Sequence, residues 1–455
     1  MTAGAKVAAV LFRQFVDDDL GCASYLIGDE SAGWAVVVDP AFAIESYVAE
    51  AERRGVRIER VLETHNHADH VSGHGRLALE HGAAVSIHPA AEPQYDYEPI
   101  EDGDEVEVGE VELRVLHTPG HRPEHCAFAV ADRSRSEEPW LVLTGDSLFV
   151  GDVARPDLAV AAQEGAHGLF HSLRRLFELP DGVEVYPGHV SGSLCGAGMS
   201  SKASSTIGFE RRFNRALSSA SEEEFVADRT GGRAPRPPNL DRIVALNRGP
   251  FLGRQPELQR VPDAAGATVL DVRTADAFAG GHIGGALNIP VSGTSFATRA
   301  GFLLEPDEPV VLHAASPEEA AHAAAGLRSV GLLELPGYLE HPPATERLET
   351  VDLDELEALL AAGTVDLVDV READERDEGY IPGSRHIPYR LLRSCADSLG
   401  NGRPVVTICE SGARAAVAAS VLVAAGIDAR PVLRGGIRGW EERGNETVGF
   451  RRCGA

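Results

Sequence analysis

Short apolar runs that end in a polar residue or a turn recur through the first half of the chain. Examples are the segments 34–40 (WAVVVDP), 111–120 (VELRVLHTPG) and 140–146 (WLVLTGD). Runs of this length that are rich in Val and Leu predict short strands. Because binding and catalytic residues often stand in loops on a rigid scaffold, the polar residues at these strand ends are candidates for function.

The second half of the chain contains one pattern twice. Val269–Arg273 (VLDVR) matches Leu367–Arg371 (LVDVR), at an offset of 98 residues. Later matches at the same offset are 282–284 (HIG) with 380–382 (YIP), and 288–290 (NIP) with 386–388 (HIP). In both copies short Val, Leu and Ile strands alternate with helical stretches, which predicts two α/β domains with parallel sheets.

Two breaks in composition suggest domain boundaries. The segment 228–239 (DRTGGRAPRPPN) has no apolar periodicity, and 341–345 (HPPAT) precedes an expected helix within 351–363 (VDLDELEALLAAG). A chain of 455 residues is also long enough for about three domains. We therefore expect domains at 1–250, 251–345 and 346–455.

The charge balance disfavours several classes of partner. The chain has 42 Lys and Arg against 70 Asp and Glu, a formal net charge of −28, which is unsuited to coating nucleic acid or an anionic membrane surface. No apolar run approaches the ~18 residues of a membrane span. We expect a soluble, cytoplasmic protein without a nucleic-acid or membrane partner. The six cysteines form no CxxC pair, which argues against a disulfide scaffold or a cysteine-type zinc site.

Histidines are concentrated in one part of the chain, with nine of the 17 between residues 65 and 125. The loop Thr64–His70 (THNHADH) follows an apolar strand end, so several imidazoles and one carboxylate can face a single point. Three further polar residues end apolar strands, namely His121, Asp146 and His189. This set predicts a metal site. We expect the remaining histidines of the region to be packing or surface residues: His74, His81, His88, His117 and His125.

The residue types allow two kinds of metal centre. The loop Thr64–His70 offers three histidines and one aspartate, and the later strand ends offer three more groups. If all seven groups bind metal, two ions can generate hydroxide near neutral pH and polarise a carbonyl, as in a hydrolase. If two histidines and one carboxylate bind a single ion, the remaining positions stay open for oxygen and substrate, as in non-haem Fe(II) oxygenases. Composition does not separate these alternatives.

These residues resemble the metallo-β-lactamase superfamily over roughly residues 1–250, which implies an αββα sandwich. In that family His65, His67 and His121 match one metal position, Asp69, His70 and His189 match the other, and Asp146 matches the bridging carboxylate. The segments 145–158, 192–196 and 204–210 look like those of persulfide dioxygenases fused to rhodanese domains.

The dioxygenase resemblance implies one Fe(II) per chain, held by His67, His121 and Asp146. Outer residues would orient these ligands and the substrate: His65, Asp69, His70 and His189. Two zinc ions, as in a glyoxalase II-like thioester hydrolase, are the alternative. Cys195 follows His189 by six residues, and it either holds a sulfane sulfur or packs as a small residue in a Gly-rich turn.

A second candidate site begins at Cys409. The apolar run Val405–Ile408 leads into 409–414 (CESGAR) and then into an Ala-rich helix from Ala415. A strand, loop and helix in this order direct backbone N–H groups and a helix N-terminus at the sulfur, which favours a thiolate and the docking of an anion. Arg414 adds a fixed positive charge, so the pattern suits a sulfur nucleophile.

This second site resembles the rhodanese sulfurtransferases, through the DVR strands, the HIP segment, the CxxGxR loop and 435–440 (GGIRGW). In the first copy Pro309–His313 matches Pro404–Ile408, which places Ala314 at the nucleophile position and Glu319 opposite Arg414. We therefore expect two rhodanese domains, of which the first is inactive and serves as a spacer or docking surface.

Together the two resemblances imply a persulfide dioxygenase and sulfurtransferase that acts in sulfide detoxification. Its partners would be the persulfide of a small thiol, O₂ and sulfite, and thiosulfate would form when Cys409 passes sulfane sulfur to sulfite. One alternative is the zinc hydrolase with an attached sulfurtransferase. Another is a non-enzymatic carrier or sensor in which Cys409 and Cys195 only store sulfur. A homo-oligomer remains open.

Overall fold

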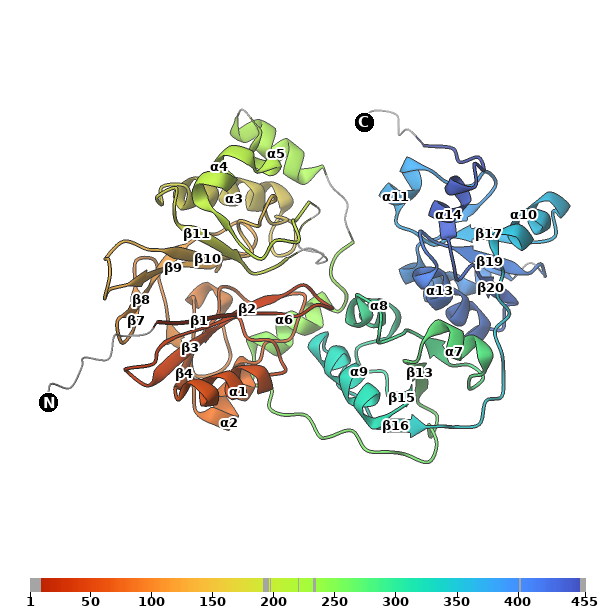
Figure 1. Cartoon of the computed structure of the whole chain (residues 1–455), viewed down its shortest axis with the longest axis horizontal. Helices are drawn as coiled ribbons and strands as arrows, with labels where there is room; N and C mark the ends of the chain where they lie inside the picture. The colour runs from red at the N-terminus through yellow and green to blue at the C-terminus, as the bar shows by residue number, and fades with distance from the viewer. Residues whose placement is uncertain are drawn as a thin grey trace, which may run out of the picture. The chain divides into compact units, whose positions relative to one another are not determined.

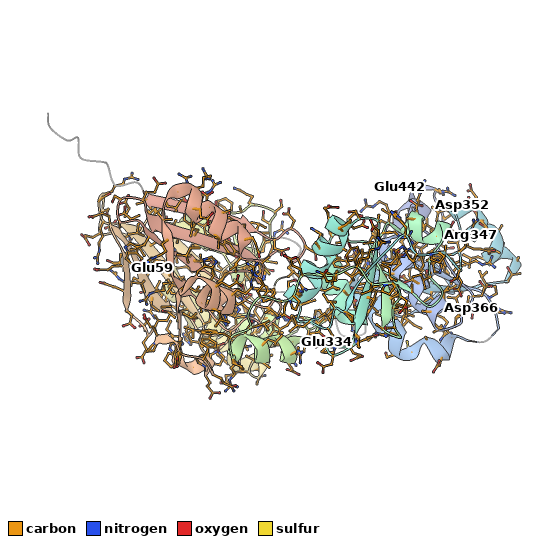
Figure 2. The ribbon with its side chains drawn as sticks, turned by 90° about the horizontal axis from the view of Figure 1, so that it is seen from below. Glu59, Glu334, Arg347, Asp352, Asp366 and Glu442 are labelled. Atoms are coloured by element: carbon orange, nitrogen blue, oxygen red, sulfur yellow. The ribbon has the colours of Figure 1, made fainter. Side chains whose placement is uncertain are left out.

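The computed structural model describes residues 10–190, 196, 198–219, 221–231, 235–400 and 402–450. The chain divides into two units. One runs to Gln255, with the short segment Arg328–Gly331 grouped with it, and the other begins at Pro256. Acidic side chains such as Glu334, Asp352 and Glu442 are exposed, which places part of the negative charge in solvent (Figure 2).

Two six-stranded sheets lie face to face in the first unit (Figure 1). Successive side chains of a strand point to opposite faces, so Tyr25 and Ile27 enter the core between the sheets while Leu26 packs on the outer side. The first sheet has the order β1 (Val10–Val16), β2 (Ala23–Asp29), β3 (Trp34–Val38), β4 (Arg57–Leu62), β5 (Ala84–Ile87) and β6 (Glu98–Pro99). The second has the order β12 (Ser205–Thr206), β11 (Glu184–Pro187), β10 (Leu141–Gly145), β9 (Cys126–Asp132), β8 (Val111–His117) and β7 (Glu105–Val108).

Helices cover the outer face of each sheet. Tyr47 and Leu77 from α1 (Glu45–Arg54) and α2 (His74–His81) pack on the first sheet. Leu169, Ile207 and Phe225 pack on the second sheet from α3 (Ala162–Leu176), α4 (Ile207–Phe213) and α5 (Glu222–Thr230). The four layers confirm the expected αββα sandwich, and the three strands expected at 34–40, 111–120 and 140–146 are β3, β8 and β10.

The composition break at 228–239 does not end the first unit. Helix α6 (Leu240–Arg248) follows it and still belongs to this unit. Asn247 of α6 explains why, because its side-chain amide donates hydrogen bonds to the backbone oxygens of His67 and His70 at 3.1 and 2.8 Å. The helix therefore holds the histidine loop in place.

Two parallel four-stranded sheets form the second unit, as expected. They have the orders β14 (Leu287–Asn288), β13 (Thr268–Asp271), β15 (Val310–Ala314), β16 (Gly337–Glu340), and β18 (Arg385–His386), β17 (Asp366–Asp369), β19 (Val405–Ile408), β20 (Ala429–Pro431). Asp271 lies opposite His313, and Asp369 lies opposite Ile408. The register therefore makes Ala314 the structural equivalent of Cys409.

Short helices complete the second unit. They are α7 (Ala275–Gly280), α8 (Phe296–Leu303), α9 (Pro317–Ser329), α10 (Leu353–Ala362), α11 (Ala373–Glu378), α12 (Leu392–Cys395), α13 (Ala413–Ala424) and α14 (Gly436–Glu442). The expected helix after residue 351 is α10, capped by the Asp352 side chain, and the helix expected from Ala415 begins at Ala413. None of the helices in the described ranges is long and apolar enough to span a bilayer. The boundary near residue 345 between the two copies stays a prediction.

Candidate metal centre and sulfur-transfer site

The predicted ligands stand in the loops that follow β4, β8, β10 and β11. Strands β10 and β11 are parallel neighbours, so the residues just past their carboxyl ends meet. His189 Nδ1 lies 2.7 Å from Asp146 Oδ1 as a result. The sheet thus brings together two residues that are 43 positions apart in the sequence.

Asp39, at the end of β3, fixes the start of the histidine loop. Its carboxylate accepts hydrogen bonds from the backbone N and the hydroxyl of Thr64, at 2.7 and 2.8 Å. Since that hydroxyl proton is used, Thr64 Oγ1 accepts from His65 Nδ1 at 2.8 Å. Burial, together with the nearby His67, lowers the pKa of His65 well below its usual value. The ring is therefore neutral, with its lone pair on Nε2.

His121 is oriented in the same way by a backbone oxygen. Its Nδ1 donates to the carbonyl of Arg155 at 3.1 Å, which leaves the lone pair on Nε2. That nitrogen lies 3.6 Å from Asp146 Oδ2. Burial favours protonation of Asp146, but the contact with His189 holds the pKa of this carboxyl below its usual value. Two imidazole lone pairs and one carboxylate oxygen thus face the same space.

One ligand atom from each of His65, His121 and Asp146 lies within 4.8 Å of the other two, and all three side chains are buried. In the described part of the chain, His65 Nε2 and Asp146 Oδ2 are buried without a hydrogen-bond partner, as are His67 Nδ1 and His70 Nε2 of the histidine loop. Buried polar atoms are rarely left unpaired, and a divalent cation bound by His65, His121 and Asp146 would satisfy His65 Nε2 and Asp146 Oδ2. This group is a candidate metal centre.

His67 points elsewhere. Its Nε2 lies 3.1 Å from Glu63 Oε2 and 3.3 Å from Asp39 Oδ1, in a separate buried group. Although burial and the nearby His70 oppose protonation, the two carboxylates raise the pKa of His67 to about 9. The structure therefore departs from the expected ligand set, because it groups His121 and Asp146 with His65 and leaves His67 with two carboxylates.

A third group, buried except for the partly exposed Asp69, contains the remaining predicted residues. His189 Nε2 lies 2.7 Å from Asp69 Oδ2, and His70 Nδ1 lies 3.3 Å from Asp69 Oδ1. Cys22 joins them, with its sulfur 3.3 Å from His189 Nε2 and 3.5 Å from His70 Nδ1. His189 thus links this group to the metal centre, because its Nε2 contacts Asp69 and its Nδ1 contacts Asp146.

The cysteine loop in the second unit has the expected strand, loop and helix. Cys409 follows β19 directly and is 1% exposed, and Gly412 N donates to its sulfur at 3.1 Å. The GGIRGW segment supports the loop from the other side, because Ile437 N donates to the Cys409 carbonyl at 2.9 Å. The sulfur therefore accepts one backbone hydrogen bond, from the residue that caps the N-terminus of α13.

Comparisons with known proteins agree with this geometry. The model of the metallo-beta-lactamase superfamily matches residues 17–189, and the rhodanese-like domain matches 255–340 and 352–443. The mitochondrial persulfide dioxygenase ETHE1 of Bos taurus is 32% identical over 244 residues, which are 53% of this chain and 88% of that protein. The chain belongs to the metallo-beta-lactamase superfamily.

Two more relatives extend the match. The mitochondrial persulfide dioxygenase ETHE1 of Homo sapiens is 32% identical over 248 residues, 54% of this chain and 90% of that protein. The crystal structure of a metallo-beta-lactamase from Staphylococcus aureus has a TM-score of 0.67 at 30% identity and covers 74% of this chain and 99% of its own. The first unit makes up a smaller share of the chain than the 74% that this structure covers, so the similarity reaches into the rhodanese-like part.

Membership of the metallo-beta-lactamase superfamily implies a bound metal, and the donor set fits one. Two imidazoles and a carboxylate suit several divalent ions, including zinc and iron. Cys22, Asp39 and Glu63 were not among the predicted ligands. Asp39 ends the apolar segment 34–40 as Asp146 ends 140–146, so the pattern of polar residues at strand ends already indicated it. Cys195, proposed as an accessory thiol, lies outside the described residues.

Arg414, in the first turn of α13, forms a two-pronged ion pair with Glu375 of α11. Its two terminal nitrogens lie 2.5 Å from the two carboxylate oxygens. Burial opposes the charge, but Glu375 raises the pKa of Arg414. The fork geometry fixes the guanidinium plane beside the cysteine loop, where it can meet an anion.

Gly412 is expected to be indispensable for the cysteine loop. Its φ is +123°, and an added Cβ would collide with the carbonyl oxygen of Leu433. Gly412→Ala should therefore displace the N–H that faces Cys409 and lower sulfur transfer about 10²-fold, the usual effect of losing one well-placed donor. Steady-state transfer rates check this.

The matched control is Gly426→Ala in the same domain. Gly426 also has a positive φ, +79°, but no atom of the described residues lies within 4 Å of its added Cβ. Backbone strain in Gly426→Ala should lower the free energy of unfolding by about 1 to 2 kcal/mol and leave sulfur transfer unchanged. Equal losses of transfer in both variants would show that strain alone, and not the position of the Gly412 N–H, accounts for the effect.

The middle domain is expected to stay inactive even with a thiol restored. Glu319 Oε2 accepts a hydrogen bond from Ala315 N at 2.5 Å. This backbone N–H is therefore not available to a thiolate at position 314. In a Cys409→Ser background, Ala314→Cys should give no sulfur transfer above background, because the loop lacks both the donor and the arginine. Measurable transfer by that variant would contradict this account.

Proposed function

We propose that the chain oxidises the persulfide of a small thiol with O₂ and then transfers sulfane sulfur through Cys409. The first reaction is R–S–SH + O₂ + H₂O → R–SH + SO₃²⁻ + 2 H⁺. In the second, Cys409 takes the outer sulfur of another persulfide and releases R–SH. Sulfite then attacks that sulfur, the S–S bond to Cys409 breaks, and thiosulfate leaves. The role would be sulfide detoxification in the cytoplasm.

The observation that carries the first activity is the group of two histidines and one carboxylate, His65, His121 and Asp146. We propose that these residues hold one Fe(II). When bound, iron supplies neighbouring open positions at which O₂ and a sulfur anion can meet. The persulfide dioxygenase relatives support the same substrate class.

The contacts of His189 support one ion rather than two. Its Nδ1 engages Asp146 Oδ1, which would otherwise be the oxygen available for a bridge to a second ion. Its Nε2 engages Asp69, so one ligand atom of the third group is already used, whereas His70 Nε2 has no hydrogen-bond partner among the described residues. His189 would therefore orient Asp146 as an outer partner and not as a ligand.

A two-zinc thioester hydrolase is the second candidate, because Cys22, Asp69, His70 and His189 can each offer a ligand atom within 4.8 Å of the others. The deciding experiment combines metal analysis of the purified protein with O₂ uptake and sulfite formation on a panel of small-thiol persulfides. We expect about one iron per active chain and one O₂ per sulfite. Two zinc ions per chain, turnover of an acyl-thiol ester and no O₂ uptake would overturn the proposal.

A further inference from the structure

His125 lies beside the metal centre, although its position in the sequence gives no sign of it. It immediately precedes β9, is fully buried, and its ring centroid lies 5.3 Å from that of His65 and 6.5 Å from that of His121. It belongs to none of the three groups that could bind an ion among the described residues. His125 instead contacts Asp146, the third residue of the metal centre.

That contact is a hydrogen bond to the backbone of Asp146. The Asp146 N lies 2.9 Å from His125 Nε2, and the other ring nitrogen lies 2.9 Å from Thr118 Oγ1. A backbone N–H can only donate, so Nε2 must accept and the ring proton must be on Nδ1, donated to Thr118. Thr118 N also donates to the His125 carbonyl at 2.8 Å. The ring is therefore held at both nitrogens and in one tautomer.

The turn that His125 holds leaves no room for a side chain at Gly145. Gly145, just before Asp146, has a φ of +48°, and a Cβ added there would lie 2.6 Å from His125 Nε2 and 2.9 Å from the Thr64 side chain. The imidazole thus fills the space beside the turn, and its lone pair satisfies a buried N–H that would otherwise be unpaired. The direction of the Asp146 carboxylate depends on that turn.

We propose that His125 is a positioning residue of the metal centre: it fixes the Asp146 turn so that Oδ2 faces His65 and His121. The inference rests on the proposed metal centre but not on the identity of the reaction. Losing a partner that orients a ligand typically costs 10- to 100-fold in metal affinity. A ring that only fills space would be replaced by another apolar group with little effect on the metal.

The test measures Co²⁺ binding to the full chain, because the visible absorption of bound Co²⁺ reports ligand geometry and needs no turnover. His125→Leu keeps the bulk and removes the acceptor, and it should weaken Co²⁺ binding about 10- to 100-fold and change the spectrum. His125→Gln can place an amide oxygen near the position of Nε2, and it should restore most of the affinity and the spectrum. Circular dichroism of the metal-free proteins shows whether each variant is folded.

Thr118→Val provides a second measurement if His125→Leu does not fold. It leaves the acceptor in place and removes only the partner of Nδ1, so it should weaken Co²⁺ binding less than tenfold. The inference is overturned if folded His125→Leu binds Co²⁺ with wild-type affinity and spectrum, or if His125→Gln is as impaired as His125→Leu. A wild-type protein that binds Co²⁺ in this way, yet takes up no O₂ with iron, would refute the proposed function alone.

Discussion

Cys409→Ser is expected to lower sulfane-sulfur transfer by at least about 10³-fold, the scale seen when a nucleophile is removed. The serine hydroxyl cannot form the S–S bond that carries the outer sulfur, even though Gly412 N still faces its position. Thiosulfate formation from a small-thiol persulfide and sulfite measures the loss. Mass spectrometry should find the added sulfur on Cys409 of the wild-type protein.

Oxygen uptake should be unchanged in the same variant, because the metal centre lies in the first unit and Cys409 in the second. Cys395→Ser is the matched control, since Cys395 is a second thiol of the same domain outside the cysteine loop. It should transfer sulfur at the wild-type rate. Retention of transfer by Cys409→Ser would mean that another thiol is the carrier.

His65→Gln is expected to weaken metal binding more than about 100-fold and to abolish O₂ uptake. Loss of an outer partner costs up to about 100-fold, and loss of one of three ligands should exceed that. The proposed ligand atom is Nε2, which has no hydrogen-bond partner among the described residues. Chelator competition with Fe²⁺ measures the affinity.

His67→Gln is the matched variant, with the same replacement two residues away at a residue that is also buried. Its amide can still donate to Glu63, so the carboxylate keeps a partner. We expect metal binding to weaken by no more than about 10- to 100-fold, as for an orienting residue. If His67→Gln weakened metal binding more than His65→Gln did, His67 and not His65 would be the ligand.

Local sequence was sufficient to predict much of the molecule. The αββα layers were implied by the resemblance of the histidine motif to the metallo-β-lactamase superfamily, and the parallel sheets follow from the repeat that begins at Val269 and Leu367. The cysteine loop is equally local, because Cys409, Gly412 and Arg414 stand on one strand, loop and helix. Neighbours in the sequence fix these features, so their patterns can be read directly.

Contacts between distant segments decided the rest. The choice between His65 and His67 depends on Asp39, 25 positions before Thr64, which uses the Thr64 hydroxyl and thereby sets the His65 ring. Cys22 reaches His189 across 167 positions, and His125 reaches Asp146 across 21. The sequence by itself therefore determined which folds the chain adopts and which loops hold the candidate groups. Only the tertiary structure decided which ring nitrogen faces which carboxylate, because side-chain direction depends on hydrogen-bond partners that folding brings together.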